Sequence, residues 1–117
     1  MNAISKILEA QKIINNNLAS EIRSTNLNKW GKELEVSLFN GVRIYIVYND
    51  FNQYSYSVIY SESKHDRIRY DNYDDRWDVT TKPHHLHLRG SRQTIESKMI
   101  GNPHKDMEIL VQIVLSI

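Results

Sequence analysis

Two histidines and an arginine alternate along the segment Pro83–Gly90. In an extended strand, residues two apart share a face, so His85, His87 and Arg89 are expected to point the same way. His84 then projects toward the core, where a hydrogen-bonded structural role is expected. A row of imidazoles and a guanidinium can bind phosphate, transfer protons or hold a metal ion. The segment therefore predicts a functional site on one side of a sheet.

A second polar row precedes this segment. Arg67, Arg69 and Asp71 alternate with two apolar residues, so the three charged side chains share one face of a strand. Consecutive strands often pair, and opposed residues of a pair have Cβ atoms roughly 5 Å apart. We therefore expect one cluster on the uncovered face of the sheet, formed by Arg67, Arg69, Asp71, His85, His87 and Arg89.

This cluster suits phosphoryl chemistry. One histidine, with a pKa near neutrality, can take the proton of a ribose 2′-hydroxyl, while the other histidine or an arginine assists departure of the 5′-oxygen. Arginines stabilise the charge that develops on the phosphate. We predict a metal-independent ribonuclease site with His85, His87, Arg69 and Asp71 as catalytic residues. Phosphate or nucleic acid would be bound by Arg67 and Arg89, with Tyr73 and Trp77 stacking on bases.

A metal site is the main chemical alternative at these residues. Two histidines and a carboxylate, His85, His87 and Asp71, form a set that can hold iron or zinc. The nearby arginines would repel a divalent cation, so phosphate recognition is favoured and neither metal nor cofactor is expected. The acidic stretch 71–78 lacks the spacing and the closing glutamate of an EF-hand, which favours a solvated loop.

The elements around the site are predicted from hydrophobic periodicity. Apolar residues at three- and four-residue steps predict a helix from Asn2 to about Ser24, with a possible break into two at Asn15–Asn17. Alternation predicts strands over 33–39, 42–48, 53–60 and 67–71, followed by the histidine strand.

Local signals refine this order. Asn40-Gly41 predicts a type I′ hairpin, Asn102-Pro103 predicts the start of a closing helix, and tyrosines 54, 56, 60 and 70 are expected to pack in the core. Residues 91–101 have no clear pattern, and a long acidic loop covers 72–82. The prediction is an α+β fold, with an antiparallel meander of about five strands and one covered face.

Composition sets the outer limits. At 117 residues, the chain is expected to form one domain over residues 1–117. It contains no cysteine, which removes disulfides and thiolate sites and fits a reducing cytoplasm. Fifteen Lys and Arg against fourteen Asp and Glu give no global argument for nucleic-acid binding. No apolar run approaches the roughly 20 residues of a membrane span, so we expect no membrane contact.

Residues 30 to 90 resemble a known family, the TumE-like toxins of toxin–antitoxin systems. The resembling features are the Asn40-Gly41 hairpin, Tyr54-Ser55-Tyr56-Ser57, Arg69-Tyr70-Asp71-Asn72 and Pro83-His84-His85-Leu86-His87. The spacing between the last two segments is the specific part. The resemblance implies a small α+β toxin, a helix-turn-helix antitoxin encoded beside it, and nucleic acid or the translation machinery as target.

Two further interpretations stay open at this stage. The same arginines suit a non-catalytic module that binds a phosphate-containing ligand or nucleic acid in a salt-dependent manner. Alternatively, the apolar stripe that ends at Ile117 suits a protein that docks a partner helix without enzymatic activity. A homodimer is also compatible with the sequence.

Overall fold

The computed structural model describes residues 1–30 and 32–117. Along the described chain, seven strands lie between an N-terminal and a C-terminal helix. The elements are α1 (Ala3–Asn17), β1 (Ile22–Asn28), β2 (Glu33–Leu38), β3 (Arg43–Tyr48), β4 (Tyr54–Ile59), β5 (Arg67–Asp71), β6 (His85–His87), β7 (Thr94–Glu96) and α2 (Pro103–Leu115). The predicted α+β class, with a helix at each end of an antiparallel meander, is confirmed.

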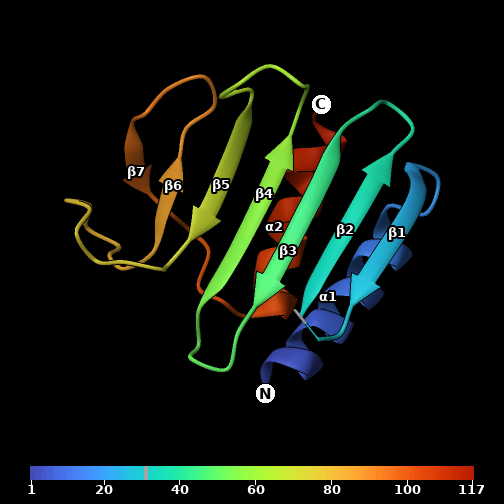
Figure 1. Cartoon of the computed structure of the whole chain (residues 1–117), viewed down its shortest axis with the longest axis horizontal. Helices are drawn as coiled ribbons and strands as arrows, with labels where there is room; N and C mark the ends of the chain where they lie inside the picture. Colours follow the sequence, from blue (N-terminus) through green and yellow to red (C-terminus); the bar gives the residue numbers. More distant parts are fainter. Residues whose placement is uncertain (31) are drawn as a thin grey trace.

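The strands form one sheet in the order β1-β2-β3-β4-β5-β6-β7, and every neighbouring pair is antiparallel. Figure 1 shows α1 and α2 on the same face of this sheet, behind β1 to β4, whereas β5 to β7 extend beyond the helices. Within residues 1–30 and 32–117, no helix covers the opposite face (Figure 1). This arrangement leaves the β5–β7 half free to present side chains away from the core.

The core lies between the sheet and the two helices. Alternation puts Leu34 and Val36 of β2, with Ile44 and Ile46 of β3, on the covered face, where all four are fully buried. Burying an aliphatic side chain of this size contributes roughly 1.5–3 kcal/mol. The helices contribute their own buried stripes, which are Ala3, Ile7, Ala10 and Ile14 of α1 and Met107, Leu110, Val111 and Val114 of α2.

The first helix is shorter than its apolar pattern predicts. Asn2 caps α1 by accepting a hydrogen bond from the Ser5 backbone N–H at 2.8 Å, and the helix ends at Asn17. The expected continuation to about Ser24 is wrong, because the chain turns at Leu18 and Ile22 begins β1. Three consecutive asparagines have poor helix propensity and favour this early end. Leu18 is fully buried, which satisfies the same pattern without a helix.

The Asn40-Gly41 hairpin forms between β2 and β3 as expected, but with a different turn. A type I′ turn needs a positive φ at both central residues. Gly41 has a φ of 91°, but Asn40 does not have a positive φ, so the turn is not type I′. Instead, the Asn40 side chain accepts a hydrogen bond from the Val42 N–H at 3.0 Å. The Gly41 N–H donates to the Leu38 carbonyl oxygen at 3.1 Å, so the turn is centred on Phe39 and Asn40, and left-handed Gly41 follows it.

Two strands were missing from the sequence prediction of about five. β1 occupies the end of the expected helix, and β7 lies within residues 91–101, which have no clear pattern of their own. The closing helix begins at Pro103 as predicted, with the Asn102 side chain accepting from the His104 N–H at 2.9 Å. Among the residues described, neither helix has the length and hydropathy needed to cross a bilayer.

Candidate functional site

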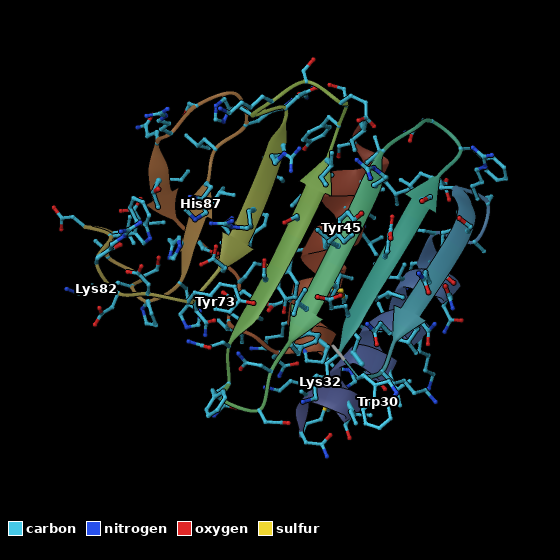
Figure 2. All side chains as sticks on the ribbon, in the orientation of Figure 1. Trp30, Lys32, Tyr45, Tyr73, Lys82 and His87 are labelled. Atoms are coloured by element: carbon cyan, nitrogen blue, oxygen red, sulfur yellow. The ribbon has the colours of Figure 1, made fainter. Side chains whose placement is uncertain are left out.

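The two polar rows predicted from alternation meet in the structure. β5 pairs with β6 so that Asp71 lies opposite His85 and Arg69 lies opposite His87. Figure 2 shows His87 on β6, on the face turned away from the helices. The short pairing register therefore brings one carboxylate, one guanidinium and two imidazoles together.

Asp71 is the centre of this cluster. Its Oδ1 lies 2.8 Å from His85 Nε2, and its Oδ2 accepts a hydrogen bond from Arg69 Nε at 2.8 Å. The same Oδ2 lies 3.2 Å from His87 Nε2, and the Tyr73 backbone N–H donates to Oδ1 at 3.2 Å. Only 1% of Asp71 is exposed. A carboxylate buried to this degree needs such partners, because an unpaired charge is costly in the interior.

His85 is held from both ring nitrogens. Its Nδ1 lies 2.8 Å from the carbonyl oxygen of Pro83, and its Nε2 faces Asp71. Both neighbours are acceptors, so both contacts are hydrogen bonds when each nitrogen carries a proton. The residue is 1% exposed, with the Trp77 ring 5.6 Å away. The expectation that His85 lies on an open face is wrong, since the 72–82 loop covers it.

His87 is the histidine that reaches the surface. Its side chain is 23% exposed, and the Trp77 ring packs perpendicular to it with the ring centres 5.4 Å apart. Its Nε2 lies 3.1 Å from Arg69 Nη2, and no described residue bonds its Nδ1. Burial and the neighbouring Arg69 guanidinium lower the pKa of His87 below its usual value, although Asp71 opposes this. The lowered pKa favours the neutral imidazole, which is the form that can accept a proton.

A pocket of about 460 Å³ opens beside His87. Its walls come from β4, β5, β6 and three loops, and among the described residues no carboxylate lines it. The lining residues are Ser57, His65, Arg67, Arg69, Arg76, Trp77, His87, Leu88, Ser91 and Arg92. Four arginines around one pocket create a positive potential that suits an anionic ligand. We call this set the arginine pocket.

Three side chains of the arginine pocket that can carry a positive charge are not predicted from the sequence. His65 lies in the β4–β5 connection, Arg76 in the acidic loop and Arg92 in the segment without a pattern. Alternation places residues only within strands, so it gives no position for loop side chains. The sequence shows only that these residues can carry a positive charge. Ordinary surface residues share that property, so it does not mark these three as site residues.

Trp77 lies over the histidines rather than in free solvent. Its ring contacts both imidazoles, and the Arg76 guanidinium sits 4.6 Å from the ring centre. Arg76 is also paired with Asp74 at 3.3 Å. The acidic loop expected to be solvated thus covers part of the sheet face and supplies one wall of the arginine pocket.

Two predicted binding residues lie elsewhere. Arg89 follows β6, pairs with Asp66 at 2.6 Å and places its guanidinium 3.8 Å from the Tyr60 ring centre. It lines a groove beside α2 and not the arginine pocket, because the strand ends at His87 and the alternation stops there. Tyr73 lies beyond the end of β5 in Figure 2 and does not line the pocket either.

The other aromatic and histidine assignments hold. His84 stacks on Tyr54 at 5.8 Å, and its Nδ1 lies 2.9 Å from the Tyr54 hydroxyl, which is the structural role expected for it. Tyr54, Tyr56 and Tyr70 are buried, and Tyr60 is partly buried against the core. These tyrosines form the covered face and take no part in the site.

The cluster also has the composition of a metal site. Ligand atoms of Asp71, His85 and His87 all lie within 4.8 Å of one another. However, Arg69 contacts both Asp71 Oδ2 and His87 Nε2, so a positive group occupies the position a cation would share. Electrostatic repulsion from that guanidinium works against a divalent ion. The donor set fits a metal by type, while its charge environment fits an anion.

The fold and the site define a small α+β protein with an arginine-lined pocket beside a buried carboxylate. Residues 4–117 match the family model described as Toxin TumE. No curated protein and no solved structure shows a significant match. Because the match covers nearly the whole chain, the chain belongs to the TumE toxin family. It is the toxin component of a toxin–antitoxin system, and the family implies an antitoxin partner.

Proposed function

We propose that this toxin cleaves RNA at the arginine pocket without a metal ion. The observation that carries the proposal is a partly exposed His87 that contacts both Arg69 and a buried Asp71. A base, an orienting carboxylate and an anion-binding guanidinium are the groups that transesterification of a ribose phosphate requires. Single-stranded RNA supplies the 2′-hydroxyl and an accessible phosphate.

His87 acts as the general base in this proposal. The two contacts of its Nε2 favour opposite tautomers, since Arg69 donates to that nitrogen while Asp71 accepts from it. A phosphate that takes the Arg69 guanidinium leaves Nε2–H to donate to Asp71. The lone pair then lies on Nδ1, which no described residue bonds. Nδ1 removes the 2′-hydroxyl proton, and Asp71 stabilises the imidazolium that forms.

Arg69 stabilises the phosphate as it becomes pentacoordinate. The 2′-oxygen attacks phosphorus, the bond to the 5′-oxygen breaks, and that oxygen takes a proton from solvent. The products are a 2′,3′-cyclic phosphate and a 5′-hydroxyl. His85 holds Asp71 in place and does not touch substrate, because it is buried behind His87. Trp77 supplies an aromatic wall beside the reacting phosphate.

The antitoxin is proposed to be the helix-turn-helix protein that the family resemblance implies. A partner that neutralises this toxin needs to prevent RNA from reaching the arginine pocket. RNA, free or within the translation machinery, is the proposed target.

Incubation of the protein with RNA in excess EDTA tests the proposal. The wild-type protein should cleave, and His87→Ala should reduce the rate by about 10²- to 10⁴-fold, the usual contribution of a general base. His104→Ala is the matched control, because this histidine lies on α2 and is largely exposed. It should cleave at the wild-type rate. Products should carry 2′,3′-cyclic phosphate ends.

Cleavage that survives His87→Ala unchanged would remove this histidine from the mechanism. Salt-dependent binding of RNA without turnover would favour the second candidate, a non-catalytic binding module. The same positively charged pocket supports that function, since four arginines bind a phosphate backbone whether or not a base is present.

A further inference from the structure

The four arginines of the arginine pocket differ in how their charge is balanced. Arg69 is paired with Asp71 at 2.8 Å, and Arg76 with Asp74 at 3.3 Å. The guanidinium groups of Arg67 and Arg92 are exposed and make no ion pair or hydrogen bond with any residue in 1–30 or 32–117. The pocket therefore contains two cations that an external anion can satisfy.

The strand register places these two cations on the same side of His87, because Arg67 is two residues from Arg69 and Arg92 is two residues from Thr94, and both Arg69 and Thr94 lie opposite His87. Arg67 is two residues from Arg69 on β5, so their Cα atoms are roughly 7 Å apart on the same face of the strand. That separation is of the order that divides neighbouring phosphates in an extended single strand. Arg92 and Ser91 reach the same side of His87 from the β6–β7 connection.

His65 also lines the arginine pocket, and its backbone contacts fix its position. It has a φ of 68°, a left-handed conformation that non-glycine residues adopt uncommonly. Its carbonyl oxygen accepts a hydrogen bond from the Gly90 N–H at 2.7 Å, and the next residue, Asp66, pairs with Arg89 at 2.6 Å. These contacts join the β4–β5 and β6–β7 connections. Such strain is typical of functional sites.

We infer that Arg67, Arg92 and His65 form a second phosphate subsite, one nucleotide away from the phosphate bound by Arg69 and His87. The ligand of the pocket is then a single-stranded polynucleotide of at least three nucleotides, whose two successive phosphates occupy the two ends. A mononucleotide, or a dinucleotide without a terminal phosphate, fills one end alone. The inference rests on the proposed function for the position of the first phosphate.

Binding of short 2′-deoxy oligonucleotides tests this inference. A dinucleotide has one phosphate and a trinucleotide two when the ends are unphosphorylated, and neither has the 2′-hydroxyl needed for cleavage. The wild-type protein should bind the trinucleotide about tenfold more tightly. The slope of log affinity against log salt should be steeper by about 0.7, the value for one further phosphate on a single strand.

Arg67→Ala and Arg92→Ala should each remove most of the trinucleotide advantage and leave dinucleotide affinity within about twofold. Arg23→Ala is the matched control, because this arginine is exposed on β1 at the opposite edge of the sheet. It removes the same charge and should leave both affinities unchanged. Titrations followed by NMR provide the affinities and show whether the His65 ring responds to the trinucleotide.

Equal affinity of the wild-type protein for both oligonucleotides would overturn the inference, as would an equal loss in Arg23→Ala. Tighter binding of pyrophosphate than of the trinucleotide would also overturn it, because the subsites would then lie too close for a nucleotide step. Cleavage is a separate readout. A protein that binds as expected but cleaves no RNA contradicts the proposed function and leaves the second subsite in place.

Discussion

The two faces of the sheet each contain a buried carboxylate, and the two carboxylates have opposite surroundings. Asp106 of α2 is completely buried on the covered face and accepts from the Tyr56 hydroxyl at 2.7 Å and from the N–H groups of Ile100 and Gly101 at 3.0 and 2.7 Å. Asp71 is as deeply buried on the other face, but its side-chain partners are Arg69 and two histidines.

The two carboxylates differ in whether their hydrogen-bond networks stay in the core or reach a pocket. In the part of the chain that the structure describes, the Asp106 side chain bonds only neutral groups, and burial raises its pKa. The Tyr56 hydroxyl continues to Tyr48 at 2.9 Å, and both tyrosines are within the core. Asp71 bonds groups that carry or accept protons, and two of them line a pocket. A buried carboxylate therefore anchors a fold when its network is closed and suits chemistry when its network reaches solvent.

Removing Asp106 should have the largest effect on stability. Asp106→Ala removes the shared acceptor of the Tyr56 hydroxyl and of two partly buried backbone N–H groups, at about 1–3 kcal/mol each, so we expect a loss of about 3 kcal/mol. Chemical denaturation measures this change. Asp78→Ala, at an exposed loop position, should stay within about 0.5 kcal/mol. A loss below about 1 kcal/mol would show that water replaces the carboxylate and that the network is not closed.

Neutralising Asp71 should act mainly on turnover. Asp71→Asn removes the charge that stabilises a His87 imidazolium, so we expect RNA cleavage to fall by about 100-fold in kcat, with KM nearly unchanged because Arg67 and Arg92 remain. Asp106→Asn is the matched control on the other face and should lose less than about threefold, measured well below its melting temperature. Equal losses in the two variants would erase the functional distinction between the carboxylates.

The sequence predicted the centre of the site because its geometry depends on strand alternation alone. Arg69, Asp71, His85 and His87 were placed on one face by a period of two, and the pairing of β5 with β6 brought them together. Periodicity does not report what covers a face. The burial of His85 beneath Trp77 therefore could not be predicted, and an open pair of histidines was expected where only His87 is accessible.

The errors elsewhere have the same physical origin. Arg89 was assigned to the site because the alternation was extended two residues beyond the end of β6. Leu18 and Ile22 satisfy a helical stripe and also a buried turn with a strand start, so the sequence could not separate the end of α1 from β1. His65 depends on a left-handed backbone and a contact to Gly90, which are tertiary features.

A pair of tyrosine substitutions compares the two faces of the sheet with a smaller expected loss of stability. Tyr48→Phe breaks the hydrogen bond to Tyr56 in the closed network, and we expect a loss of about 1 kcal/mol. Tyr45 lies on the uncovered face, where Figure 2 labels it, and donates to Glu35 at 3.0 Å near solvent. Tyr45→Phe should change stability by less than about 0.5 kcal/mol, since water can replace it. Urea denaturation of the two variants decides whether the closed network is the more sensitive one.

The smallest expected effect is on the pKa of His87, and it tests the contacts of His87 with Asp71 and Arg69 directly. Arg69 lowers the pKa of His87 and Asp71 raises it, so Arg69→Gln should move that pKa up and Asp71→Asn should move it down. NMR measures both shifts, with the exposed His104 as an internal reference. A shift in the same direction in both variants would contradict the assigned contacts.

The lowered pKa of His87 also makes the stability of the wild-type protein depend on pH. Because the folded protein binds the His87 proton less tightly than the unfolded chain, the stability that depends on this histidine is complete above about pH 6.5. It is lost as the pH falls from there through the lowered pKa. His87→Gln should remove this part of the acid dependence of unfolding, and Tyr48→Phe should retain it, because the Tyr48 network does not include the histidine. An identical acid dependence in wild type and His87→Gln would mean that the proton affinity of His87 is the same in the folded and unfolded chain.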